Sequence, residues 1–544
     1  MREDNDDSRR PTSEWDWQSR YPRFPGRLLD PSTVSVDGIR AFPTVYVPQR
    51  LVVSTLRGID SVLGTLREAA RGLGWEVAPD EKFGERIVEE PEGAREDRLA
   101  RYPWATGPLG VSRLLITVAK DTATAAPDAW TLLQRARALP GTPDLRGVGL
   151  DHVLTLDSSL SSNPFHSTNP FHSTNPFHST NPFHFTNPAD SSVDVGAIAS
   201  YGVQGSGGLQ PVAFAGAAPR RRVDDERGSR RPVVGTVDTG CGNHPWLDGI
   251  VRTDVGIDGR AIGHVSPADD PEVHPDLVGP LDGAIDADSG HGTFIAGLIH
   301  QACPDADIVA WRVVDSDGTI VESDLVATLT DIGTLVQRHA SGRADGLALD
   351  VLNLSMGYYH ETPKDELFDP TMYELLASLG RCGTVVTCSA GNDATERPMF
   401  PAAFAPWAGG GNPNPLDPAA VPIVAAGALN PNRSTVALFS NTGPWVSAWA
   451  PGAAVVSTMP SFEGGGLPLA RTVAGGHTRE SIDPDDFRGL FAVWSGTSFA
   501  APLVAGAVAA ALDDILADAG ASSSPGQSVE RAIKAIHEAT SIAP

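Results

Sequence analysis

The sequence predicts a doubly wound α/β domain with a mainly parallel sheet, preceded by a small α+β domain. Three observations support this fold class. The chain has 544 residues, more than one ordinary core uses. From residue 232 onward, short apolar strands alternate with helical segments, as in sheets with helical crossovers. These strands are expected near residues 233, 308, 351, 384, 423 and 455. Before residue 157 the predicted order is strand, helix, strand, strand, helix, strand, which is the ferredoxin-like arrangement.

Composition and charge exclude several classes of function. Hydrophobic residues make up 41% and charged residues 20%, as in ordinary soluble proteins. A formal charge of −26 argues against a nucleic-acid partner, because phosphates attract Lys and Arg. No apolar run approaches the length of a membrane span, and the charged segment at residues 1–7 lacks the apolar core of a signal peptide. We therefore expect a cytoplasmic protein without a membrane partner.

The N-terminal region divides into an arm and a domain. Residues 1–40 are polar and rich in Arg, Asp and Pro, which favours a disordered arm. Residues 41–157 carry the α+β pattern. Its strands are expected at residues 45–53, from 74, at 113–118 and at 148–156, and its helices at 59–73 and 128–138.

A repeat links the two predicted domains, within residues 158–231. The hexapeptide from Asn163 to Thr168 recurs from Asn169 and Asn175, and in altered form from Asn181. A proline in each copy blocks helix and weakens strand pairing, so we interpret the repeat as a linker. Two alternatives stay open: a metal site made by regularly spaced histidines, and recognition of the Asn-Pro-Phe motif by an unknown partner. The histidines are His166, His172, His178 and His184.

Basic clusters follow the repeat. Arg220–Arg222 and Arg230–Arg231 precede the strand that begins at residue 233. They are either cut to release the following domain or mark its edge.

Three polar residues stand at constrained positions in residues 232–544. Asp238 ends an apolar strand, His291 lies between two glycines beside a helix start, and Ser498 follows a small-residue turn into an apolar helix. A serine nucleophile needs a base for its proton and a third group to orient that base. The set therefore predicts an acid, a base and a nucleophile. Taken singly, each has a structural alternative, since Ser caps helices and Asp forms turns.

A fourth residue offers a hydrogen-bond donor. Asn392 follows a β-branched strand in a tight turn, and its amide with the Ser498 N–H predicts an oxyanion hole. Asn after Gly is also ordinary turn chemistry. The Asp-Thr-Gly turn at Asp238 is typical of aspartic proteases as well, but these need a second such turn, and the sequence has none.

Together these motifs resemble the subtilisin-like serine proteases, or subtilases. The ordered motifs are the Asp-Thr-Gly turn, the His-Gly-Thr helix start, residues 353–357, the Ala-Gly-Asn turn and the Gly-Thr-Ser-Phe-Ala-Ala-Pro segment, spanning roughly residues 230–540. The resemblance implies a serine endopeptidase acting through an acyl-enzyme, with protein or peptide substrates and no required cofactor. It also implies that substrate pairs with Leu354, Ser355, Met356 and Gly357, and that Ser389, Ala390 and Gly391 form the facing wall.

The resemblance raises two further expectations. Calcium is common in the family, and the acidic turns at residues 286–288 or 315–318 are where it would bind, although such turns are usually solvated loops. The fold predicted for residues 41–157 is that of the propeptide found ahead of many subtilases, which inhibits the enzyme with its C-terminal tail. An independent partner-binding domain is the alternative.

Some features depart from the family pattern. Phe499 stands where many members carry Met after the nucleophile, and residues 461–488 form a long insertion. The four cysteines show no zinc spacing, so we expect free thiols. Two other classes of function keep the same residues: a peptide-binding scaffold that no longer cuts, and a peptide ligase or cyclase that gives the acyl-enzyme to an amine.

Overall fold

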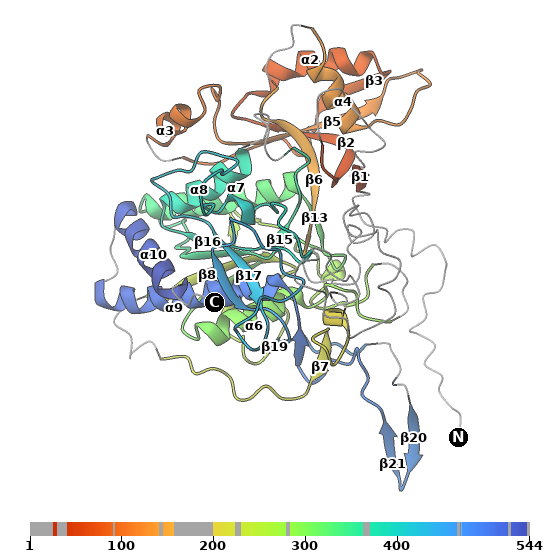
Figure 1. Ribbon diagram of the computed structural model, residues 1–544, viewed down its shortest axis with the longest axis vertical. Coiled ribbons are helices and arrows are strands. Elements are labelled where there is room, and N and C mark those ends of the chain that lie inside the picture. The colour runs from red at the N-terminus through yellow and green to blue at the C-terminus, as the bar shows by residue number, and fades with distance from the viewer. Residues whose placement is uncertain are drawn as a thin grey trace.

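The computed structural model describes residues 26–29, 41–90, 93–140, 145–156, 198, 200–223, 230–278, 283–362, 370–464, 468, 470–519 and 524–540. Within them, a small α+β part lies against one side of a larger α/β part (Figure 1). The hexapeptide repeat, with its histidines and Asn-Pro-Phe motifs, lies outside the described residues.

A seven-stranded parallel sheet forms the centre of the larger part. In spatial order its strands are β18 (Ala448–Pro451), β17 (Val424–Leu429), β16 (Val385–Ser389), β14 (Val351–Leu354), β8 (Val233–Asp238), β12 (Asp307–Arg312) and β9 (Val251–Arg252). Every neighbouring pair is parallel. β8, β14 and β16 are buried at every position, as strands covered on both faces must be. The predicted doubly wound α/β class is confirmed.

Helices cover both faces of this sheet. They are α6 (His291–Ala302), α7 (Glu322–Ala340), α8 (Thr371–Arg381), α9 (Thr497–Ala519) and α10 (Pro525–Thr540). Successive residues of β8 point to opposite faces: Val237 joins the core made with α7 and α8, and Val234 joins the core made with α6, α9 and α10.

One predicted strand belongs elsewhere. β19 (Val455–Thr458) pairs with β22 (Phe491–Trp494), and β22 pairs with β7 (Gln210–Val212), in a separate antiparallel sheet. The parallel sheet ends instead at β18. The last residue of β18, Pro451, has no N–H with which to extend the ladder, and the chain leaves the sheet there.

Helix α9 corrects the expectation that no apolar run reaches membrane-spanning length. Residues Thr497–Leu516 are long and apolar enough to cross a bilayer by length and composition. Because 72% of that stretch is buried inside the molecule, its apolar side chains are those of a core helix.

The N-terminal part has the predicted ferredoxin-like order. Its elements are β2 (Thr44–Ser54), α2 (Ile59–Arg71), β3 (Trp75–Pro79), β5 (Gly110–Val118), α4 (Ala129–Arg137) and β6 (Val148–Leu156). The strands lie in the antiparallel order β6-β2-β5-β3. One face of this sheet packs on α2 and α4 through residues such as Leu51 and Val53, while Val52 faces the core that contains α7 and α8.

Several elements were not expected. β1 (Arg27–Leu29) pairs with β2, so the predicted disordered arm contains a strand; the rest of residues 1–40 lies outside the described residues apart from Gly26. The charged stretch after β3 contains β4 (Glu85–Ile87) and α3 (Ala94–Arg101). β7 lies within the predicted linker. Its three residues have no recognisable periodicity, and they become a strand only by pairing with β22.

The basic clusters edge the larger part. Arg221 pairs with Asp307, Arg222 and Arg231 with Asp305, and Arg230 with Asp350. These ion pairs support the domain-edge interpretation over the cleavage interpretation. Two hairpins complete the fold: β10 (Gly256–Ile257) with β11 (Arg260–Ala261), and β20 (Arg471–Ala474) with β21 (His477–Glu480), which projects from the molecule (Figure 1).

Strand β6 runs beyond its own sheet. Its second half lies between β13 (Thr319–Val321) and β15 (Met356–Gly357), both from the larger part, and pairs antiparallel with each. Leu154 and Leu156 are buried in the same core as Leu325 of α7. The two parts of the molecule are therefore joined by a shared sheet and a shared core (Figure 1).

Candidate active site

Asp238 and His291 meet at the carboxyl edge of the parallel sheet. Asp238 is the last residue of β8 and His291 the first of α6, and His291 Nδ1 lies 2.7 Å from Asp238 Oδ1. The same oxygen accepts the Thr239 N–H at 2.8 Å. Because both side chains are 1% exposed or less, this hydrogen bond holds the imidazole ring in one orientation.

The surroundings of His291 shift the pKa of its ring. Burial acts to lower the pKa of His291, but the charge and the hydrogen bond of Asp238 outweigh it, and the pKa is raised. Nδ1 faces the carboxylate, whereas Nε2 is buried with no hydrogen-bond partner among the described residues. Nε2 is therefore the ring nitrogen that can exchange a proton with another group.

Aromatic rings fix the other faces of the imidazole. Trp494 meets it edge-on at 5.6 Å between ring centroids, and Phe499 lies at 5.3 Å. Phe499, which departs from the family pattern, is thus a packing partner of His291 in the core.

Ser498 lies in the first turn of α9 and is fully buried. Its hydroxyl lies 3.3 Å from the backbone oxygen of Ser355, to which it donates. The Ser355 hydroxyl in turn donates to the Ser498 backbone oxygen at 2.9 Å. The next residue, Phe499, packs on His291, so α9 begins beside the imidazole. The Ser498 hydroxyl is directed to Ser355, and it forms no hydrogen bond with His291 among the described residues. A hydrogen bond between a catalytic serine and its histidine often tightens only when substrate is bound.

Asn392 is held with its amide nitrogen free. Its Oδ1 accepts the Thr497 N–H at 2.9 Å and the Thr497 hydroxyl at 3.0 Å. Nδ2 is buried and has no partner within the part of the chain that the structure describes. A buried donor without an acceptor is costly, so this atom fits a ligand oxygen that is yet to arrive.

Glu272, a buried glutamate that no sequence motif marks, supports the Asp238 turn. Glu272 accepts hydrogen bonds from the Thr239 and Thr293 hydroxyls and from the Gly292 N–H. Burial raises the pKa of Glu272 to about 7, against the lowering effect of the two threonines. Glu272 stands in an irregular loop and acts through a contact with residues distant in sequence, so no local pattern marks it.

The two predicted substrate walls are both at the site. Met356 and Gly357 of the first wall form β15, and the strand they pair with is β6 of the same chain.

Gly391 of the facing wall has φ 106° and donates its N–H to the Thr497 hydroxyl at 3.0 Å. A Cβ at Gly391 would lie 2.1 Å from Asn441 Nδ2, so only glycine fits there. Leu354 ends β14, Ser389 ends β16, and Ala390 donates its N–H to Ala426. β13, on the other side of β6, was not predicted as a wall.

The two acidic turns lie side by side. The Ser316 hydroxyl donates to Asp286 Oδ2 at 2.6 Å, and that oxygen also accepts the N–H groups of Leu277 and Val278. Burial, with nearby carboxylates adding to it, raises the pKa of Asp288 to about 7. Calcium binding at these turns stays a prediction. The four cysteines are free thiols, as expected.

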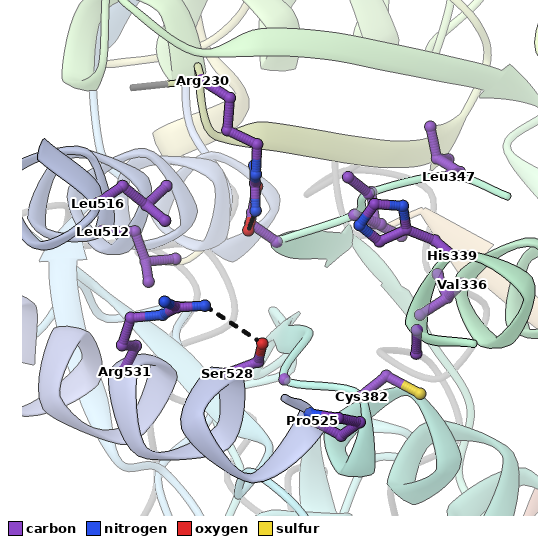
Figure 2. A pocket seen from close by; sticks show the side chains of 15 residues that line it. Arg230, Val336, His339, Leu347, Cys382, Leu512, Leu516, Pro525, Ser528 and Arg531 are labelled. Atoms are coloured by element: carbon purple, nitrogen blue, oxygen red, sulfur yellow. Dashed lines mark hydrogen bonds and ion pairs between the residues drawn. The ribbon is translucent and has the colours of Figure 1, made fainter. Parts of the chain in front are cut away.

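A cavity of about 220 Å³ lies at the opposite edge of the sheet (Figure 2). It is lined by residues that include Arg230, Asp350 and Arg531, at the amino ends of β8 and β14 and on α10. Arg230 and Asp350 form a two-pronged ion pair with both contacts at 2.6 Å. Because Asp238 lies at the carboxyl end of β8, this cavity is separate from the cluster of His291 and Ser498.

Comparison with known proteins identifies the family. Residues 229–535, more than half of the chain, match the subtilase family, peptidase S8, and the chain belongs to this family. It is 26% identical over 287 residues to the thermophilic serine proteinase of Bacillus sp. (strain AK1), a match that covers 53% of each chain. It is 27% identical over 299 residues to subtilisin-like protease 5 of Arthroderma gypseum, covering 53% of this chain and 57% of that one.

The chain thus spans about half the length of these curated relatives. A solved structure with a similar arrangement is that of fervidolysin from Fervidobacterium pennivorans, described as a keratinolytic enzyme related to subtilisin. The TM-score is 0.43 at 17% identity, over 90% of this chain and 57% of that chain.

Proposed function

We propose that the chain is a serine endopeptidase that hydrolyses peptide bonds of protein or peptide substrates through Asp238, His291 and Ser498. The observation that carries this proposal is the buried Asp238–His291 hydrogen bond of 2.7 Å, which leaves His291 Nε2 free to act as a base. Family membership supports the same reaction.

In the proposed reaction Ser498 Oγ forms a bond to the substrate carbonyl carbon while its proton passes to His291 Nε2. The imidazolium, stabilised by Asp238, then gives the proton to the leaving amine as the peptide C–N bond breaks. Water attacks the resulting ester with its proton taken by His291, and the acid product leaves as Ser498 is restored.

Asn392 stabilises the intermediate in this proposal. Its free Nδ2 and the Ser498 N–H donate to the oxyanion that forms on the carbonyl oxygen. Thr497 holds the amide of Asn392 through two hydrogen bonds, so the donor is oriented before substrate arrives.

The N-terminal part restrains this activity. Strand β6 occupies the position between β13 and β15 where an extended substrate would pair. On one edge of β6, Leu156 donates its N–H to the Gly318 oxygen at 2.8 Å. On the other edge, Leu156 lies opposite Met356 of β15. The chain's own strand therefore competes with substrate for pairing with β13 and β15.

The register of β6 also indicates a site of self-cleavage. Leu156, the last described residue of β6, lies opposite Met356, and the residue before Met356 is Ser355, which contacts Ser498. Residues 157 and 158 lie outside the described residues. The bond between them, Asp157–Ser158, is the one we propose for cleavage.

A fluorophosphonate probe tests the proposal, because it labels only an activated serine. Wild type is expected to be labelled at Ser498 and to cleave a general peptide substrate, whereas Ser498→Ala does neither. Absence of label on wild type, with β6 displaced by mild denaturant, would favour the peptide-binding scaffold. Product masses that contain two joined peptides in place of hydrolysed ones would favour the ligase or cyclase.

A further inference from the structure

The buried carboxylate of Glu272 joins the end of β8 to the start of α6. Its Oε1 accepts hydrogen bonds from the Thr239 hydroxyl at 2.5 Å and from the Gly292 N–H at 3.1 Å. Its Oε2 accepts the Thr293 hydroxyl at 2.5 Å. Thr239 directly follows β8, and Gly292 and Thr293 lie in the first turn of α6. The proposed peptidase reaction assigns no role to this carboxylate.

The Thr239 hydroxyl lies between two carboxylates. It is 2.5 Å from Glu272 Oε1 and 3.2 Å from Asp238 Oδ1, the oxygen that holds His291 Nδ1 at 2.7 Å. The Gly292 N–H donates to the hydroxyl oxygen at 2.8 Å and so keeps it in place. A hydroxyl has one proton to donate, and an ionised acceptor forms the stronger hydrogen bond. Glu272 and Asp238 therefore compete for the Thr239 proton.

The charge of Glu272 depends on pH near neutrality. Burial raises the pKa of Glu272 to about 7, and the charges of Asp270 and Asp238 act in the same direction. Burial also raises the pKa of the neighbouring Cys241 thiol well above its usual range, so this thiol carries no charge. The cation at this turn is Arg312, which borders Gly240 together with Glu272 and whose guanidinium pairs with Asp269 and Asp270.

The charge of Glu272 affects the base of the proposed reaction in two ways. Against the lowering effect of burial, the charges of Asp238, Asp288 and Glu272 each raise the pKa of His291. An ionised Glu272 also holds the Thr239 proton away from Asp238. A neutral Glu272 releases that proton to Asp238, whose carboxylate then stabilises the imidazolium less. Both effects make His291 a stronger base when Glu272 is ionised.

We propose that Glu272 is a positioning residue of the active site, which sets the basicity of His291 through the Thr239 hydroxyl and the Asp238 carboxylate. This inference rests on the proposed peptidase function, because it assigns Glu272 a part in tuning the base of that reaction. Glu272 exchanges its own proton with solvent and passes none to the substrate. As pH rises and Glu272 ionises, the Thr239 hydroxyl turns from Asp238 to Glu272, and His291 becomes the stronger base.

Titration of His291 in the full-length Ser498→Ala chain tests the proposal. Proton NMR follows the Nδ1–H of His291, whose chemical shift reports the proton on Nε2 and whose signal is assigned by its loss in His291→Gln. Glu272→Gln is expected to lower the pKa of His291 by about one pH unit, because the amide is neutral and competes poorly for the Thr239 proton. In the chain that keeps Ser498, the acid limb of kcat/KM is expected to move to lower pH by the same amount.

Thr239 supplies a matched pair of backgrounds for Glu272→Gln. Thr239→Ser keeps the hydroxyl, and the full pKa shift of His291 is expected there. Thr239→Val puts a methyl group in its place, and about half of the shift or less is expected, left by the charge of Glu272 alone. Circular dichroism and urea unfolding establish that each variant folds.

The proposal is overturned if Glu272→Gln leaves the pKa of His291 unchanged, or if its effect is as large with Thr239→Val as with Thr239→Ser. The first of these outcomes needs no change at Thr239, so it decides the question even where the Val variant does not fold. Since Ser498→Ala cannot cleave, the titration gives its answer whether or not the peptidase proposal holds.

Discussion

The side-chain amide of Asn392 is held in one orientation by Thr497. Both hydrogen bonds to its Oδ1 come from Thr497, the neighbour of Ser498, so the amide cannot turn without losing them. Its Nδ2 is left buried without an acceptor among the described residues, and this is the donor that the proposed oxyanion hole requires.

Replacing Asn392 by Ala removes this donor and leaves Ser498 and His291 in place. We expect kcat to fall about a hundred- to a thousandfold, the size known for an oxyanion-hole asparagine in subtilisin, with KM little changed. Steady-state kinetics on a general peptide substrate measure this. Asn432→Ala, in an exposed turn, is the control and keeps kcat. A KM effect with normal kcat would instead assign Asn392 to ground-state binding.

Glu272 predicts a pH dependence of stability. Its pKa rises from 4.5 to about 7 on burial, so the folded state favours the protonated acid. The stability that it contributes is fully present below pH 4.5 and is lost as pH rises through 7.

We compare Glu272→Gln with its parent, both in the Ser498→Ala background. As pH rises from 4.5 to about 7, the unfolding free energy of the variant is expected to increase relative to that of the parent, by up to about 3 kcal/mol. Urea unfolding at both pH values measures the difference, and the raised pKa of Asp288 is common to both chains. A difference that does not change with pH would contradict the assignment.

At this scale the sequence predicts residues whose position follows a local rule. Asp238 at a strand end, His291 at a helix start and Ser498 in a helical first turn are each found where their neighbours predict them. Glu272 and the cluster of His152, Glu322 and Glu361 depend on contacts between segments up to 209 residues apart. No spacing in the sequence carries that information.

Strand β6 is the element that connects fold and function. It completes the ferredoxin-like sheet through β2 and then continues between β13 and β15. Midway along it, Asp151 meets the amino end of α7, where Oδ1 accepts the Ser323 N–H and Oδ2 the Ser323 hydroxyl, both at 2.9 Å. The strand thereby caps a helix of the catalytic part.

Asp151→Ala removes the cap, whereas Asp151→Asn keeps one acceptor oxygen. Loss of a cap costs about 1 kcal/mol, so we expect β6 to leave the cleft about fivefold more often in the Ala variant. The rate of fluorophosphonate labelling of uncleaved chains reads this opening. The Asn variant is expected to stay close to wild type, and equal rates in all three proteins would show that the cap does not hold β6.

The β20–β21 hairpin is the element least tied to the rest. All eight residues of its strands are exposed, and Ser481 donates its N–H to Ala470 across its base at 2.9 Å. Replacing residues 471–480 with a short Gly-Ser turn is expected to leave both Tm and the cleavage of a small peptide unchanged, since no core contact is lost. A fall of several degrees in Tm would show that the insertion supports the fold.

Elements with strong periodicity were predicted to within a few residues. Among them are the parallel strands β8, β12, β14, β16 and β17 and the ferredoxin-like order, whereas β9 and β18 were not predicted. The elements missed are short or charged. β13 and β15 have three and two residues, and α3 carries only one large apolar side chain. They acquire their structure from partners elsewhere in the chain, most of all from β6.

In the whole molecule, the small N-terminal part packs on the larger part, and its strand β6 pairs with β13 and β15 of that part. The N-terminal sheet lies over α7 and α8 (Figure 1), and its face shares a core with them through Val52, Leu56 and Leu154. Ion pairs such as Arg101 with Glu374 and Arg113 with Asp324 cross the same interface. Ser498 and His291 are fully buried in this arrangement, and this burial supports the proposal that β6 moves before substrate binds.

The most direct test follows intact masses of wild-type and Ser498→Ala full-length chains over time, with a general peptide substrate present. We expect wild type alone to shorten, with cleavage after residue 157, and to cleave the peptide as the N-terminal fragment leaves. Identical fragments from both chains would assign the cut to another protease. If both chains stay intact and the peptide is untouched by either, Ser498 is not acting as a nucleophile and the central proposal is contradicted.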